Sequence, residues 1–349
     1  MPLKVLERCP EENFLNGLQF GFPLAFSPLP YKLKFHPDKE NNVEFLYQLE
    51  SIRNPILDTL MLILTEFGNE LLFIVAGMLM FWCVDKKQGY FILMTGFFGV
   101  YINQFLKITC RIPRPWVQDP NFTIVEAARE AASGYSFPSG HTQTAVGCYA
   151  GLAVCRKEKW VRIVGAAMAL LIPFTRMYLG VHTPLDVGVS ILVALALIFI
   201  LWPLFSRYGL NRKLMYPLMA ALTAMGIGFL LYVCLYHFPA DIDPANYEGA
   251  VENAYKFLGC GLGLWVIYEV DTRFIRFETK TATWWAQILK LVLGFGLLLL
   301  VMEGSKPLLN LIFKGHFVAH TVRYFCTVLF AGVVWPLTFK WFARPGAKR

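Results

Sequence analysis

The chain has 349 residues, of which 56% are hydrophobic and only 16% are charged, and its formal net charge is +8. Soluble domains have about 25% charged residues, so this composition excludes an ordinary water-soluble domain and indicates several membrane spans. The positive charge does not indicate nucleic-acid binding. The basic residues stand in short loops between apolar segments, where membrane topology accounts for them.

The first 69 residues predict an irregular segment followed by one helix. Residues 1–45 are interrupted by prolines, and no small-residue cleavage site follows, so no cleavable signal peptide is expected. Residues 46–66 have apolar positions at helical spacing beside charged ones, and they are too short and too polar to span. We therefore expect an amphipathic helix along the membrane interface, ended by Gly68-Asn69-Glu70.

Nine apolar segments follow, and each predicts a membrane-spanning helix. A span needs about 20 residues, so the first and third segments need extension by flanking turns. Because no segment has strand periodicity, the expected fold is an all-α, polytopic membrane bundle of about nine transmembrane helices. The predicted spans are 70–84, 89–110, 141–156, 160–179, 184–205, 214–236, 252–270, 284–302 and 321–341.

Charge in the connecting loops predicts the orientation of these helices. Sixteen Lys and Arg residues stand in the set 85–88, 156–162, 206–213, 271–280 and 340–349. The alternate loop 238–250 has none, and 303–320 has two. By the positive-inside rule the basic set is cytoplasmic, which leaves the N-terminus outside and the C-terminus inside. Loop 111–140 and the turn 180–183 are then expected on the non-cytoplasmic face.

Three short clusters on that face combine cations with groups that hold or attack phosphate. In the first, Lys107 and Arg114 are seven residues apart, or two helical turns, although Pro113 and Pro115 disfavour a helix that continues to Arg114. Interfacial cations that reach towards water are the alternative interpretation. That interpretation fits Arg111, which ranks below the other two.

The second cluster ends loop 111–140 and begins a helix. Pro138 disfavours helical backbone at Phe137, Ser139 is a favourable N-cap, and Gly140 allows a ligand to approach the backbone closely. The free N–H groups and the dipole of a helix N-terminus attract anions, and His141 lies in this first turn. A plain N-cap beside an incidental histidine is the alternative.

The third cluster joins the end of one span to the start of the next. Arg176 is a cation suited to bidentate phosphate binding. Thr183, Pro184 and Asp186 have the spacing of N-cap, N1 and N3, so a capping box alone accounts for Asp186. The functional alternative uses the same geometry, because a carboxylate four residues after His182 can accept its ring N–H while the other nitrogen attacks.

Together the clusters predict phosphoryl transfer. Cations and backbone N–H groups would hold the phosphate oxygens, one histidine would attack phosphorus, and the other would protonate the leaving oxygen. The sequence has no H-E-x-x-H motif, no Asp/Glu cluster and no Walker loop. We therefore expect no metal and no cofactor. Cys110 stands beside the first cluster, but its apolar helical context accounts for it without a nucleophilic role.

At these residues the chain resembles the type 2 phosphatidic acid phosphatase (PAP2) family, whose signature is K-x6-RP, PSGH and SR-x5-H-x3-D. The three parts read here as Lys107…Arg114-Pro115, Pro138-Ser139-Gly140-His141 and Thr175-Arg176…His182…Asp186, with Thr175 in place of the usual serine. The resemblance implies that His182 is the nucleophile, that His141 is the general acid and that Asp186 orients His182. The phosphate-binding residues that it implies are Lys107, Arg114, Ser139, Gly140 and Arg176.

The resemblance also predicts a domain division and a function. Residues 70–205 would form the catalytic core, after the N-terminal segment 1–69, and the helices of 206–349 have no assigned role. The expected activity is metal-independent hydrolysis of a lipid phosphate or diphosphate, such as undecaprenyl diphosphate or phosphatidate. It would take place at the outer face of a bacterial plasma membrane, with the lipid substrate and the bilayer as partners. A lipid phosphotransferase and a non-enzymatic lipid transporter or binding protein are the alternatives.

Overall fold

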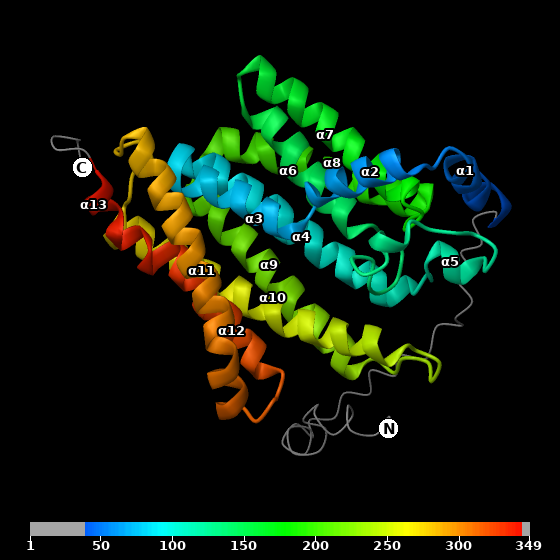
Figure 1. Ribbon diagram of the computed structural model, residues 1–349. Coiled ribbons are helices and arrows are strands. Elements are labelled where there is room, and N and C mark those ends of the chain that lie inside the picture. Colours follow the sequence, from blue (N-terminus) through cyan, green and yellow to red (C-terminus); the bar gives the residue numbers. More distant parts are fainter. Residues whose placement is uncertain (1–38, 344–349) are drawn as a thin grey trace.

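The computed structural model describes residues 39–343, and these residues form an all-α bundle without a β-strand (Figure 1), which confirms the predicted fold class. The predictions for residues 1–38 lie outside the described range. The α-helices are α1 (Lys39–Ser51), α2 (Pro55–Glu66), α3 (Glu70–Leu79), α4 (Lys86–Cys110), α5 (Pro115–Gln118), α6 (Gly140–Cys155), α7 (Lys159–Tyr178), α8 (Pro184–Tyr208), α9 (Arg212–Leu235), α10 (Pro244–Val270), α11 (Trp284–Ile312), α12 (Val318–Leu329) and α13 (Phe339–Phe342). Short π-helical turns, η3 (Met80–Val84), η5 (Asp271–Ile275) and η6 (Phe330–Val334), continue α3, α10 and α12.

The single helix predicted over 46–66 is wrong, because the chain forms α1 and α2 with a break between them. Pro55 begins α2 and disfavours helical backbone at the residue before it. Asn54 is accordingly extended, with φ −156°, and its side chain accepts the backbone N–H of Leu57 at 3.1 Å. The predicted break at Gly68-Asn69-Glu70 is present, with Asn69 as the N-cap of α3.

Each of the nine predicted spans coincides with a helix. Not every one of these helices is long and apolar enough to cross a membrane by itself. Among the described residues six helical segments do so: α4 with α5, α7, α8, α9, α11, and the run from α12 to α13. The pair α2 and α3–η3 is a seventh if its 45° bend is allowed within one span. Of the remaining two, α6 has only 16 residues, and α10 carries Glu252 and Lys256.

Helix α4 lies at the centre of the bundle and contacts α3, α6, α8, α9 and α10. Its Tyr101 ring stacks on Phe257 of α10 with centroids 4.0 Å apart, and the Tyr101 hydroxyl donates to the Phe257 carbonyl at 2.6 Å. Buried Trp82 donates from Nε1 to the carbonyl of Ala331 at 2.8 Å. The C-terminal helices thus share one apolar core with the first half of the chain. The predicted domain boundaries after residues 69 and 205 stay a prediction.

The basic loops gather at one end of the bundle, near α13, and α5 lies at the opposite end (Figure 1). Lys86 forms an ion pair with Asp271 at 2.7 Å, and Arg156 donates to Gln88 at 3.3 Å. These contacts join the loops after η3, α6 and α10. Because the loops that follow α4 and α7 lie at the other end, the bundle has a basic end and a second end that contains the three clusters.

Close packing of α10 against α12 gives a testable prediction of stability. An added Cβ on Gly259 of α10 would lie 2.3 Å from the backbone carbonyl oxygen of Thr321 on α12, a contact that requires backbone movement. We expect Gly259→Ala to lower the free energy of unfolding by about 1–3 kcal/mol through overpacking, as seen in a lower Tm in detergent. Gly228→Ala on α9 is the control, because nothing lies within 4 Å of its added Cβ. Equal Tm values for the two variants would show that α10 and α12 are not in this contact.

Candidate active site

The three clusters meet at the end of the bundle opposite the basic loops, around a cavity of about 280 Å³. The C-terminal part of α4, the N-terminus of α6, the end of α7 and the turn before α8 contribute to its wall. Six of the predicted site residues line it: Lys107, Arg114, Gly140, His141, Arg176 and His182. The other two, Ser139 and Asp186, are buried behind this wall. Residues that are separate in the sequence therefore share one site with several cations.

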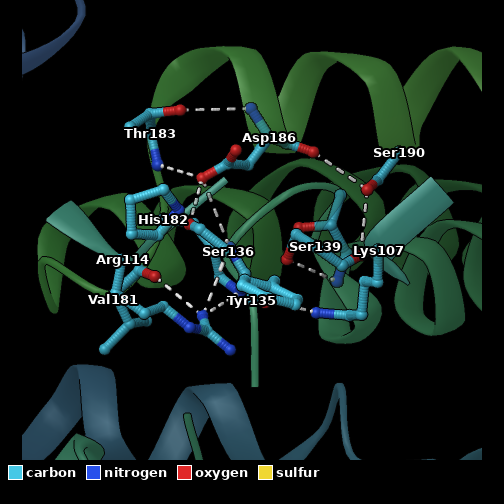
Figure 2. A network of polar contacts seen from close by, with 12 residues as sticks. Lys107, Arg114, Tyr135, Ser136, Ser139, Val181, His182, Thr183, Asp186 and Ser190 are labelled. Atoms are coloured by element: carbon cyan, nitrogen blue, oxygen red, sulfur yellow. Dashed lines mark hydrogen bonds and ion pairs between the residues drawn. The ribbon is translucent and has the colours of Figure 1, made fainter. Parts of the chain in front are cut away.

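His182 occupies the turn between α7 and α8 and is only 2% exposed. Its Nδ1 lies 3.5 Å from Oδ2 of Asp186. The same carboxylate oxygen accepts the hydroxyl of Ser136 at 2.6 Å and the backbone N–H of Thr183 at 2.7 Å (Figure 2). Thr183 in turn accepts the N–H of Asp186 at 3.3 Å, which completes the capping box. One oxygen of Asp186 thus caps α8 and also faces His182, while the role of Asp186 in orienting His182 stays a prediction.

The Arg114 guanidinium lies against the His182 ring, with Nη1 3.5 Å from Nδ1. Its Nη1 is 2.9 Å from Nε2 of His182, and it also donates to the carbonyl of Val181 at 2.9 Å. Its Nε and Nη2 donate to the carbonyls of Gly134 and Ser133 at 3.0 and 2.7 Å, so loop 111–139 fixes the guanidinium. Nδ1 of His182 thus faces the Asp186 carboxylate, and Nε2 lies against the Arg114 guanidinium.

The electrostatic surroundings of His182 favour its neutral form. Burial lowers the pKa of His182 well below its usual range, and the nearby charges of Arg114 and Arg176 lower this pKa further. A neutral imidazole keeps the lone pair that nucleophilic attack requires. Burial and the neighbouring cations therefore favour a neutral His182 at neutral pH.

Two further cations are held by groups outside the sequence clusters. Arg176 is 1% exposed, and its Nη1 donates to the hydroxyl of Thr65 on α2 at 2.8 Å. Its Nε has no hydrogen-bond partner among the described residues. Lys107 donates from Nζ to the carbonyl of Tyr135 at 2.7 Å. These two cations are therefore positioned by hydrogen bonds to neutral oxygens.

The N-terminus of α6 has the predicted form. The hydroxyl of Ser139 accepts the N–H of Thr142 at 3.4 Å as the N-cap, and Ser190 of α8 donates to the Ser139 carbonyl at 2.9 Å (Figure 2). An added Cβ on Gly140 would meet no atom within 4 Å, so open space lies beside the first turn. His141 lines the cavity, and its Nε2 has no partner among the described residues. That nitrogen is free to face a ligand.

Two residues near the first cluster lie apart from the cavity wall. Arg111 ends α4 in a left-handed conformation, with φ 52°, and its N–H donates to the Lys107 carbonyl at 3.0 Å. It acts as a helix C-cap, which agrees with its lower rank. Cys110 is exposed at the helix end. Within residues 39–343, no group of three or more His, Cys, Asp or Glu side chains is placed to hold a metal ion.

Sequence reasoning missed two residues that position the site. Thr65 contacts Arg176 across 111 residues of sequence, and no motif marks it. Ser136 contacts Asp186 across 50 residues, although it stands directly before the Phe137-Pro138 pair of the second cluster. Neither contact can be predicted from a single sequence, because both depend on which segments pack together in the fold.

Comparison with known proteins gives two matches to family models. Residues 88–210 match the model described as PAP2 superfamily, and residues 255–348 match the model described as PAP2 superfamily phosphatase, transmembrane extension. The first match contains the three clusters of the cavity, and the second contains most of the helices after α9. No solved structure matches the chain at a comparable level of significance.

Several curated proteins are similar to part of the chain. An undecaprenyl-diphosphatase of Sulfolobus acidocaldarius is 28% identical over 154 residues, which are 42% of this chain and 72% of the relative. The undecaprenyl-diphosphatase BcrC of Bacillus subtilis is 31% identical over 158 residues, 43% of this chain and 76% of the relative. Sphingosine-1-phosphate phosphatase 1 of Rattus norvegicus is 24% identical over 208 residues, 57% of this chain and 45% of the relative.

Proposed function

Because the chain belongs to the PAP2 superfamily, we propose that it hydrolyses a lipid phosphate or diphosphate through a covalent phosphohistidine on His182. The predicted family resemblance is confirmed, and the chain is a membrane-integral phosphatase of phosphate monoesters or diphosphates. One observation carries the mechanism. Nε2 of His182 lies 2.9 Å from the Arg114 guanidinium while Nδ1 of the same ring faces Asp186.

In the first step Nε2 of His182 attacks phosphorus, a P–N bond forms, and the bond from phosphorus to the substrate's ester oxygen breaks. His141 in its protonated form gives its proton to that oxygen, so the product leaves as a neutral alcohol or a protonated phosphate. Asp186 stabilises the positive charge that develops on the His182 ring. Lys107, Arg114 and Arg176, together with the N–H groups at the start of α6, bind the three equatorial oxygens.

In the second step a water molecule attacks the phosphohistidine. Neutral His141 takes the proton of this water, the P–N bond breaks, and inorganic phosphate leaves with His182 restored to its neutral form. The three cations compensate the phosphate charge in both steps, so the proposal assigns no step to a metal ion. A phosphotransferase would differ only here, because an alcohol rather than water would accept the phosphoryl group.

Lipid substrates and the outer face are supported by the position of the cavity. It lies at one end of helices long and apolar enough to cross a membrane, so it meets a headgroup at the surface while the chain of a lipid stays in the bilayer. The basic loops gather at the opposite end, which is the cytoplasmic end by the positive-inside rule. The names of the relatives, which are phosphatases of undecaprenyl diphosphate and of sphingosine 1-phosphate, agree with a lipid substrate.

A substrate panel on the purified protein tests this function. Prenyl diphosphates, phosphatidate, sphingoid phosphates and glucose 6-phosphate are presented in detergent micelles with EDTA present, and inorganic phosphate is measured. We expect release from one or more of the lipids, undiminished by EDTA. Absence of release from every compound, or loss of release with EDTA, would refute the proposal. Transfer of labelled phosphate to an added lipid alcohol in place of water would identify the phosphotransferase.

A further inference from the structure

Two buried amide side chains line the active-site cavity and have unsatisfied polar atoms. Asn103 of α4 is 3% exposed, and neither its Oδ1 nor its Nδ2 has a hydrogen-bond partner among the described residues. Gln143 of α6 is also 3% exposed, and its Nε2 has no partner there either. Burying a polar group without a partner is unfavourable, so two such groups at one cavity indicate a ligand that supplies the missing hydrogen bonds.

The packing of α4 against α6 leaves room for the Gln143 amide. An added Cβ on Gly99 would lie 2.4 Å from Nε2 of Gln143, so the amide occupies space that a side chain at position 99 would fill. Asn103 is four residues after Gly99 and therefore lies on the same face of α4. Rotating the Asn103 amide by a half turn exchanges its two atoms, so the side chain offers one donor and one acceptor in either case.

The two amides lie on the membrane side of the phosphate anchors. Asn103 precedes Lys107 by one turn of α4, and Gln143 follows Gly140 by about one turn of α6, which is roughly 5.4 Å along each helix. Both steps lead from the site end of the bundle towards its middle, because α4 ends and α6 begins at the cavity. Apolar Val100 lines the cavity one further turn along α4. A substrate whose phosphate lies at the anchors would therefore place the first carbons of its alcohol beside the amides.

Two acceptor groups at this cavity favour a substrate group that can donate hydrogen bonds. Glu70, at the start of α3, lines the same cavity and supplies a carboxylate, and the Asn103 oxygen is a second acceptor. A second phosphate group has only acceptor oxygens when ionised, so it would face both of them unfavourably. A hydroxyl or an ammonium group satisfies the acceptors, and a hydroxyl also accepts from the amide N–H groups.

We propose that Asn103 and Gln143 form a subsite for a hydroxyl or ammonium group on the second or third carbon of the substrate's alcohol. This subsite rests on the proposed function, and it narrows the substrate to phosphomonoesters of a hydroxylated or aminated long-chain alcohol. Prenyl diphosphates, whose alcohol is a pure hydrocarbon, leave the amides unsatisfied. Asn103 and Gln143 determine specificity in this account and take no part in the transfer of the phosphoryl group.

Three long-chain phosphates of matched length test the subsite: octadecyl phosphate, 2-hydroxyoctadecyl phosphate and sphinganine 1-phosphate. We expect the protein to hydrolyse the two substituted compounds with a kcat/KM at least about tenfold above that of octadecyl phosphate. In Asn103→Leu and in Gln143→Met, made separately, this ratio falls towards one. Gln287→Met removes an amide at the opposite end of the bundle, where Gln287 donates to the Thr279 carbonyl, and it leaves the ratio unchanged.

The comparison separates the subsite from the proposed function. The subsite is refuted if all three compounds are hydrolysed at equal kcat/KM. It is also refuted if the ratio of kcat/KM between the substituted compounds and octadecyl phosphate is unchanged in both variants. Neither result contradicts the proposed phosphatase activity. A higher kcat/KM for farnesyl diphosphate than for the substituted monoesters also overturns the subsite. If no compound is hydrolysed, the proposed function fails. The same three lipids then test the subsite as ligands of His182→Ala, where it predicts a larger rise in Tm for the substituted pair, and an equal rise contradicts it.

Discussion

Replacing His182 by alanine is expected to reduce phosphate release on the order of 10⁴-fold or more, because it removes the nucleophile of the covalent pathway. The ring is buried and lies between Asp186 at 3.5 Å and Arg114 at 2.9 Å. The measurement is the initial rate on the best lipid of the panel, with the variant's Tm compared to show that it is folded.

His320→Ala is the matched control for this replacement. His320 lies on α12, where its Nδ1 is 3.3 Å from Glu252, and it does not line the cavity. The rate of this variant should stay within a few-fold of the unaltered protein, as expected for a change outside the site. If His182→Ala retained more than a few per cent of the activity in a preparation free of other phosphatases, His182 would not be the nucleophile.

Replacing His141 by alanine has the second largest expected effect, and that effect depends on the leaving group. His141 lines the cavity together with His182, and its Nε2 has no hydrogen-bond partner among residues 39–343, so it is available as a proton donor to the leaving oxygen. An alkyl phosphate expels a strongly basic alkoxide, so losing the acid should slow its cleavage by about 10²–10⁴-fold. p-Nitrophenyl phosphate expels a stable phenolate that leaves without a proton, so its cleavage should be slowed much less.

The His141 experiment measures kcat/KM of one variant on two esters, so folding and protein concentration cancel in the ratio. A fall of the alkyl rate relative to the phenolic rate supports the acid role. An equal fall on both esters would assign His141 to binding phosphate rather than to protonating the leaving oxygen.

Local chemistry made the ends of the helices at the site predictable. Ser139 before Gly140, and Thr183 before Pro184, are caps whose hydrogen bonds reach only the next turn. The proximity of Asp186 to His182 was predictable for a related reason, because the two residues are only four positions apart, whereas the contact of Arg114 with His182 spans 68 residues and joins two clusters. Asp186 needed the structure to show that capping and contact with His182 share one oxygen.

Contacts between distant segments were not predictable in this way. Thr65 and Ser136 hold Arg176 and Asp186 through hydrogen bonds that exist only once α2, α7 and α8 have packed. Asn103 was not predictable for the same reason. Only the structure shows that its side chain lines the cavity and that neither amide atom has a partner among the described residues. Thr65 and Asn103 are polar residues in helices and Ser136 is a loop residue, and the sequence around each of them does not distinguish a site from ordinary packing.

The break between α1 and α2 is different, because its signal was present in the sequence. Pro55 disfavours helical backbone at Asn54, and Asn54 caps the new helix with its side chain. Hydrophobic spacing continued across this point and suggested one helix. The local backbone constraint prevailed over that periodicity, and the resulting angle allows α2 to contact α7 and place Thr65 beside Arg176.

The most direct test of the account is to trap the phosphoenzyme. The purified protein is mixed with ³²P-labelled substrate and quenched in alkali within one turnover, and the labelled residue is identified by mass spectrometry. The account predicts an alkali-stable, acid-labile phosphohistidine at His182, which is absent from His182→Ala and discharged to inorganic phosphate when the reaction proceeds. Steady turnover with no labelled protein at any quench time, or label on a residue other than His182, would contradict it.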